Sequence, residues 1–393
     1  MRSFSHQETM SFRRRRRLVI NLFRKVVRCG RSNSPQRRRG FAELRRERIE
    51  EAFLLSLFLR ETLPDLRASA VSQSLGALLL LLCALTSFAQ PPPANAPNKP
   101  QLKVPVWIET EENQFWLEGK RQSFKVFLDD QEVALKNLQG PASGTILLVV
   151  FDTVVDLTRI ELARNAVTES LKNLPENHWV ALFTAQDGLN VLLEPTANRA
   201  ALAEKIAAIQ VNGRAGLLDT LEPVARLAVS IQQKANVRVS VLYVTDTGVA
   251  TYRADMLNPV VNSSDTGDLS RRFADRAVQE RMSRMAQDLS AFTIPFFMLH
   301  LEYRADTLNL AYQSGLERIA NDSGGAAQFC RTNDEIVPSL ELLLKRLRSG
   351  YVLSIDAPKR KRASVKLRVT ATDAGNQPLE RIKHADQITL PKN

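Results

Sequence analysis

Two aspartates stand directly after two long apolar runs of the chain. Asp152 follows Thr145–Phe151 and Asp246 follows Val237–Thr245. Each run has the length and continuity of a strand that is buried on both faces of a parallel sheet. Ligand sites in open α/β sheets lie outside the carboxyl ends of the strands. We therefore predict that both aspartates lie at one ligand-binding edge.

Catalytic sequence motifs do not accompany these aspartates. The sequence has no Gly-x-Ser-x-Gly elbow, no Walker loop, no Gly-x-Gly-x-x-Gly after a strand and no His-Glu-x-x-His. The four histidines are scattered, and two of them, His178 and His300, fall at the edges of predicted strands. A hydrogen-bonded structural role is the common one at such positions. We therefore predict that the protein is not an enzyme.

Strand and helix patterns alternate over residues 144–350. Predicted strands cover 145–151, 179–183, 237–245, 294–301 and 326–329, and predicted helices cover 198–209, 217–233, 269–289, 308–320 and 335–347. A capping-box pattern over Thr158–Glu161 predicts one more helix after the first strand. The alternation predicts right-handed crossovers and a doubly wound, mostly parallel, Rossmann-like α/β sheet.

Two shorter β segments flank this predicted domain. Residues 101–140 alternate apolar and polar side chains and contain the turn signal Asp129-Asp130, which predicts a small β module. Residues 351–393 show the same alternation of apolar and polar side chains and form a predicted C-terminal β segment.

The order of these pieces resembles the von Willebrand factor A (vWA) fold, and in particular the VWFA-related domain proteins known mostly from acidobacterial genomes. The resemblance covers roughly residues 104–355 and rests on matches in the family's order: Leu117, Phe124, Val126 and Asp129-Asp130, then Asp152–Asp156, Gly213–Asp219, Thr245–Gly248, Leu316–Gly325 and Arg346–Tyr351. It implies a binding or adhesion module that recognises another protein.

The resemblance also implies a metal-ion-dependent adhesion site. The family's Asp-x-Ser-x-Ser and Gly-Gly-Thr-x-Leu-x-Asp motifs supply hydroxyl ligands to Mg²⁺, but here Val154 and Ala215 replace two of those hydroxyls, and Asp156 replaces a serine. In one interpretation, Asp152, Asp156 and Asp246 still hold Mg²⁺ or Ca²⁺ weakly.

In the other interpretation the site is degenerate and binds no cofactor. Asp152 and Asp246 would then accept hydrogen bonds from loop amides, and Asp156 would cap the following helix. We favour this second interpretation because a hard cation needs more oxygen ligands than the motif supplies. Without an ion, the carboxylates would repel one another with nothing to offset them. Asp156→Ser or Asp246→Asn would then leave stability unchanged or raise it slightly.

The basic character of the chain is confined to its beginning. The formal net charge is +12, but residues 1–68 carry 17 Arg and 1 Lys against 7 acidic residues. The rest of the chain is therefore close to neutral, which argues against nucleic-acid binding by the mature protein. We interpret residues 1–68 as a basic leader, either disordered or lying upstream of the true translation start.

A secretory signal follows the leader. Residues 69–89 contain the eleven-residue apolar run Leu75–Leu85 and small residues at Ser87 and Ala89, and a proline-rich linker occupies residues 90–100. The run is too short for a membrane span and has the form of a signal peptide. We expect an exported protein that is periplasmic, outer-surface or secreted. It would keep no transmembrane anchor after cleavage and would bind a protein partner, of unknown identity, in the envelope or outside the cell.

Overall fold

A computed structural model describes residues 101–110, 114–252, 268–357 and 364–390, with the side chains of 268–274 excepted. The predicted leader (1–68), signal peptide (69–89) and linker (90–100) lie outside the described residues. Among the helices that the structure describes, none combines the length and the apolar character that crossing a bilayer requires.

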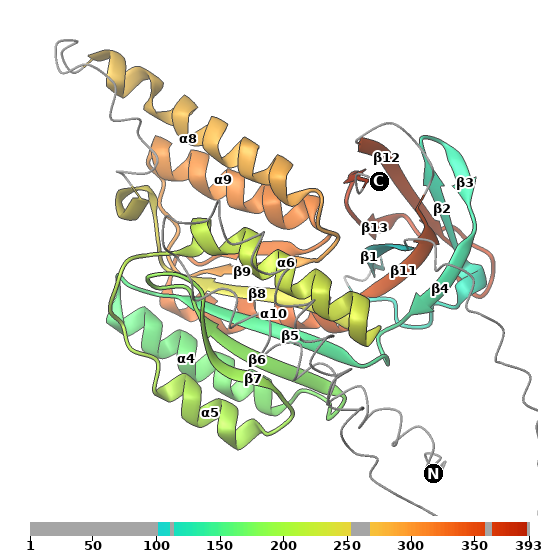
Figure 1. The fold of residues 1–393 in the computed structure, drawn as a ribbon, viewed down its shortest axis with the longest axis horizontal. Helices are drawn as coiled ribbons and strands as arrows, with labels where there is room; N and C mark the ends of the chain where they lie inside the picture. Colours follow the sequence, from blue (N-terminus) through green and yellow to red (C-terminus); the bar gives the residue numbers. More distant parts are fainter. Residues whose placement is uncertain (1–100, 111–113, 253–267, 358–363, 391–393) are drawn as a thin grey trace, which may run out of the picture. The chain divides into compact units, whose positions relative to one another are not determined.

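A six-stranded sheet forms the centre of the described structure (Figure 1). The strand order is β10 (Ala326–Phe329), β9 (Phe296–His300), β8 (Arg238–Thr245), β5 (Thr145–Asp152), β6 (His178–Thr184) and β7 (Asn190–Thr196). Every residue of β5 and β8 is buried, as their continuous apolar sequences predict. The predicted parallel, doubly wound sheet is confirmed.

Helices cover both faces of this sheet (Figure 1). One face packs against α6 (Leu217–Ala235), α8 (Asp268–Leu289) and α9 (Thr307–Asp322). The other face packs against α4 (Leu157–Lys172), α5 (Arg199–Ala207) and α10 (Ile336–Ser349). Short 3-10 turns cover Arg121–Ser123, Val249–Tyr252 and Asn333–Glu335. The sheet therefore separates two apolar cores, and its central strands β5 and β8 are buried on both faces.

The edge strand β7 is absent from the sequence prediction. It pairs antiparallel to β6, and its register with β6 is irregular between Val180 and Phe183. Its sequence contains Pro195, which removes a backbone donor and weakens the strand pattern. An edge strand tolerates this proline because one side of it needs no partner.

The segments on either side of the α/β domain combine into one β module. One of its four-stranded sheets has the order β13 (Arg381–Lys383), β1 (Gln101–Glu109), β11 (Tyr351–Asp356) and β4 (Leu135–Gln139). The other has the order β14 (Gln387–Thr389), β12 (Ser364–Ala371), β2 (Phe124–Leu128) and β3 (Gln131–Val133). The predicted turn at Asp129-Asp130 is present, and both residues adopt positive φ. Both sheets thus pair strands from residues 101–140 with strands from residues 351–393.

Buried cations join the β module to the α/β domain. The Arg238 guanidinium is 3% exposed and donates to the carbonyl oxygens of Gly140, Leu347 and Gly350 at 2.6–2.9 Å. Lys103 Nζ donates to the Gln232 carbonyl at 2.9 Å, near the C-terminal end of α6. A helix C-terminus carries partial negative charge, which favours a cation there. These contacts hold the β module at the amino edge of the sheet, away from the two aspartates.

Candidate functional site

The register of two neighbouring strands brings the two aspartates together. In the parallel pairing of β5 and β8, Asp152 lies opposite Thr245, and Asp246 follows directly. Both aspartates are fully buried. The sequence therefore predicted their shared edge correctly, because two strands of equal length and in register end side by side.

The Asp152 carboxylate accepts hydrogen bonds from the first turn of a helix and from a tyrosine. Its Oδ1 accepts from Gly216 N at 2.9 Å, and its Oδ2 accepts from Leu217 N at 3.0 Å and from the Tyr252 hydroxyl at 3.0 Å. Gly216 and Leu217 stand at the start of α6, where the helix dipole favours a negative charge. Burial raises the pKa of Asp152 to about 6, and these three hydrogen bonds act in the opposite direction.

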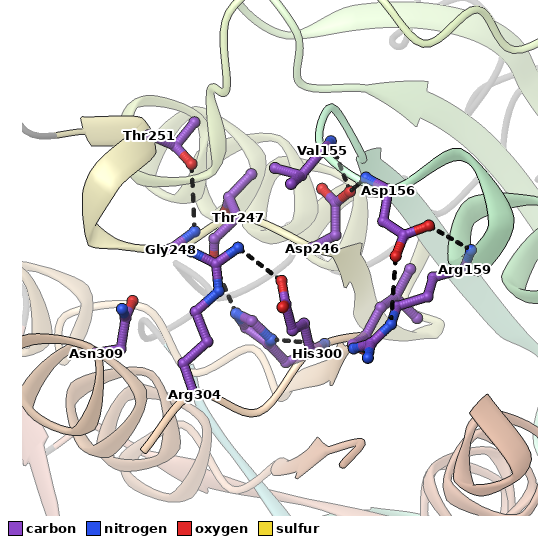
Figure 2. Close-up of polar contacts among 12 residues, drawn as sticks. Val155, Asp156, Arg159, Asp246, Thr247, Gly248, Thr251, His300, Arg304 and Asn309 are labelled. Atoms are coloured by element: carbon purple, nitrogen blue, oxygen red, sulfur yellow. Dashed lines mark hydrogen bonds and ion pairs between the residues drawn. The ribbon is translucent and has the colours of Figure 1, made fainter. Parts of the chain in front are cut away.

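Asp246 organises the loop that follows β5. Its Oδ1 accepts from Val154 N at 2.9 Å, and its Oδ2 accepts from Val155 N at 2.7 Å and Asp156 N at 2.8 Å. Figure 2 shows this carboxylate turned toward the backbone of that loop. Burial raises the pKa of Asp246, and the three amides lower it. Three consecutive amides on one carboxylate fix the conformation of the loop.

Asp156 begins the helix that follows the loop. Its Oδ1 accepts from Thr158 N at 2.9 Å and Arg159 N at 3.1 Å, so Asp156 is the N-cap of α4. The capping-box prediction with Thr158 as the cap is therefore wrong by two residues. Asp156 offers the same acceptor nearer to the strand, and the helix starts as soon as a cap is present.

A buried hydroxyl network surrounds the two carboxylates. The Thr247 hydroxyl lies 2.8 Å from Thr245 Oγ1, 3.3 Å from the Tyr252 hydroxyl and 3.4 Å from the Tyr312 hydroxyl. Thr245 and Thr247 belong to the Thr245–Gly248 motif, but no motif in the sequence assigned Tyr252 or Tyr312 to this edge. The available signal was compositional, because three of the chain's five tyrosines fall between Asp246 and the end of α9.

His300 has a structural role at this edge, as predicted. Its Nε2 lies 2.7 Å from the Thr247 carbonyl oxygen, so that nitrogen carries the proton, and its Nδ1 accepts from Glu302 N at 3.3 Å (Figure 2). Burial lowers the pKa of His300 to about 4. The ring is therefore neutral near pH 7 and bridges the ends of β8 and β9.

A close approach of the backbone fixes the loop after β8. Val249 N donates to Asn309 Oδ1 at 2.9 Å, and Gly248 N donates to Thr251 Oγ1 at 3.4 Å. A Cβ on Gly248 would lie 2.7 Å from Asn309 Oδ1 and 3.0 Å from Arg304 Nη1. A larger residue at Gly248 would therefore require the Asn309 and Arg304 side chains to shift.

The residues at this edge do not fit a hard cation. Both oxygens of Asp152 and of Asp246 already accept protein hydrogen bonds, and the side chains of Val154 and Ala215 offer no oxygen. Asp156 directs its carboxylate to the first turn of α4. Within the described part of the chain, no three His, Cys, Asp or Glu side chains gather as metal ligands would. Mg²⁺ demands near-octahedral oxygen coordination, which this donor set does not supply.

Exposed apolar side chains lie on the outward surface of the same edge. Val155 is 47% exposed and Leu157 is 65% exposed, directly beside the buried carboxylates. The other exposed large apolar residues of the α/β domain in the described ranges are Leu162 on α4, Leu310 on α9 and Val337 on α10. All three helices start at the carboxyl edge of the sheet, so apolar side chains gather there.

Comparison with known proteins identifies the domain. Residues 150–249 match the family model of the von Willebrand factor type A domain. This span holds the end of β5, the whole of β8 and both strand-end aspartates. This part of the chain is therefore similar to a von Willebrand factor type A domain, in agreement with the resemblance that the sequence motifs indicate. No curated protein matches its sequence.

Solved structures with similar folds are distant in sequence. A von Willebrand factor type A protein from Catenulispora acidiphila is 9% identical with a TM-score of 0.38, and the match covers 76% of each chain. An aerotolerance-related membrane protein from Bacteroides fragilis is 10% identical with a TM-score of 0.31, covering 51% of this chain and 98% of that one. The PilB minor pilin from Streptococcus sanguinis is 14% identical with a TM-score of 0.35, covering 53% and 62%.

Because Asp156 caps α4, its variants should change stability through the loss or retention of this cap and not through relief of repulsion between carboxylates. We expect Asp156→Ala to lower the free energy of unfolding by about 1 kcal/mol, because two amides at the start of α4 lose their acceptor. Asp156→Ser keeps a capping oxygen and should change stability by only a few tenths of a kcal/mol. Urea unfolding of both variants measures the difference. Equal stability of the alanine variant and the wild type would contradict the cap.

The raised pKa of Asp152 predicts a pH dependence of stability. The folded protein binds this proton more tightly than the unfolded chain, so stability is full below pH 4 and falls as pH rises through about 6. Asp152→Asn cannot ionise. The free energy of unfolding of the wild type minus that of the variant should therefore fall by about 3 kcal/mol between pH 4 and pH 7.

Urea unfolding of both proteins at several pH values measures this difference. His300 acts in the opposite direction, because its lowered pKa costs stability as pH falls below its usual range. It is present in both proteins, so its contribution cancels in the difference. A difference that stays constant with pH would contradict an ionising Asp152.

Proposed function

We propose that the mature chain is an exported, non-catalytic protein-binding module whose carboxyl edge recognises its partner without a metal ion. The observation that carries this proposal is the division of the edge into two layers. The carboxylates lie inside and accept backbone amides, whereas Val155 and Leu157 face outward at 47% and 65% exposure.

An exposed apolar edge favours association with another protein. Burying one large apolar side chain on association stabilises a complex by roughly 1.5–3 kcal/mol, and such anchors carry much of the energy of an interface. A metal-dependent site would instead bind through a partner carboxylate that completes the ion's ligand shell. The donor set described above supports the apolar mode.

The buried chemistry of the edge supports a binding role over catalysis. A general acid or base must reach the proton that it transfers. Asp152, Asp246 and His300 are buried and hydrogen-bonded to backbone groups of the chain itself. Each of them serves the fold.

Capture from an envelope fraction tests the binding mode. The immobilised mature chain should retain the same partner with millimolar Mg²⁺ and with EDTA, and neither condition should shift its melting temperature. Leu157→Asp should weaken capture about tenfold or more, because a charge replaces an apolar anchor. The matched control is Leu117→Asp, at a residue of the β-module segment that is 56% exposed, and it should leave capture unchanged.

Three results would contradict this proposal. The first is capture that EDTA abolishes and Mg²⁺ restores. The second is capture that Leu157→Asp leaves intact. The third is a robust hydrolase or transferase activity that a single substitution at a nucleophile removes.

Export has its own test. Expressed with its own leader in a Gram-negative host, the protein should be recovered outside the cytoplasm with its N-terminus near Gln90, directly after the small-residue cleavage pattern. N-terminal sequencing and cell fractionation measure this outcome. An intact leader on a cytosolic protein would refute the prediction.

A further inference from the structure

A groove runs between two helices on one face of the sheet. It has a volume of about 660 Å³, and its walls come from α4 and from α10, which pack beside each other. It begins at the carboxyl edge, with Leu162 on one wall and Val337 on the other, and these side chains are 40% and 49% exposed. Ala166 and Leu342 continue the apolar lining.

The far end of the groove is basic. Lys345 and Arg348, from the last turns of α10, line it there. Arg199 adds a third cation beside them, because its guanidinium donates to the carbonyl oxygen of Leu174, itself a lining residue, and to those of Pro175 and His178. Lys345 also lies over the Phe115 ring, with its Nζ 5.5 Å from the ring centroid.

Two glutamates also line the walls, and the cations in the lining of this end come from the last turns of α10 alone. Glu169 pairs with Lys172 at 2.6 Å, outside the lining. Glu341 stands one helical turn before Lys345, toward the apolar end. The groove therefore has an apolar half and a cationic end, and an occupant must match both.

We propose that the α4/α10 groove binds a short amphipathic helix of a partner protein, with its apolar face on Leu162, Val337 and Leu342 and its acidic end against Lys345 and Arg348. The lining on this wall runs from Leu162 on α4 to Leu174, two residues beyond the end of α4, and at 1.5 Å per residue this length matches a helix of about 12 residues. The groove extends the proposed protein-binding function to a second surface.

The test uses two synthetic peptides and the mature chain. Both peptides have about 12 residues and leucines at helical spacing; one ends in glutamates and the other in lysines. Fluorescence anisotropy at low salt should show at least about tenfold tighter binding of the acidic peptide, and salt should reduce this preference. The double variant Lys345→Glu/Arg348→Glu should reverse it.

Variants at the apolar end test whether the peptides bind in the groove or elsewhere on the surface. Leu162→Asp should weaken both peptides about tenfold, because a charge would enter the apolar half. Leu310→Asp is the matched control on α9, across the sheet, where the leucine is 39% exposed, and it should bind as the wild type does.

The groove proposal fails if neither peptide binds, if both bind equally, or if Leu162→Asp binds as tightly as the wild type. Leu157 lies outside the lining. Loss of partner capture in Leu157→Asp with unchanged peptide binding would therefore uphold both proposals. Peptide binding without any Leu157 effect would overturn only the carboxyl-edge interface.

Discussion

Two buried carboxylates at the ends of neighbouring strands set the structure of the whole carboxyl edge. An ionised group in a core must be paired or hydrogen-bonded. Asp152 and Asp246 meet this requirement with five backbone amides and one tyrosine hydroxyl. The loop after β5 and the start of α6 take their positions from these bonds. The pKa of Asp152 is raised chiefly by burial, and the charge of Asp246 contributes least.

Because both carboxylates accept hydrogen bonds from the protein itself, few of their oxygen lone pairs remain for a ligand at the surface. A carboxylate that accepts two or three protein donors has little left to offer a cation. Of the two positions in the loop after β5 that would carry hydroxyl ligands, one is Val154 and the other is Asp156, which caps α4. Val155 and Leu157 expose apolar surface beside them. The donor set at this edge therefore supports the metal-free, apolar recognition that we propose.

The β module shows how distant parts of the chain support this framework. Residues 101–140 and 351–393 are separated by the entire α/β domain, yet each β sheet of the module contains two strands from each segment. Arg238 and Lys103 then attach the module through backbone carbonyls. Both cations bind at the amino edge of the sheet, and these contacts therefore lie away from the carboxyl edge with its two aspartates.

The sequence by itself determined most elements of the α/β domain and their order, with the edge strand β7 as the exception. Apolar runs such as Thr145–Phe151 defined buried parallel strands, and a terminal aspartate on two of them located the edge. Tertiary structure decided the partners of those aspartates. Tyr252 lies a hundred residues from Asp152, and the loop amides lie about ninety residues from Asp246. Local patterns carry no information about such contacts, because the sheet register and helix packing that create them exist only in the folded chain.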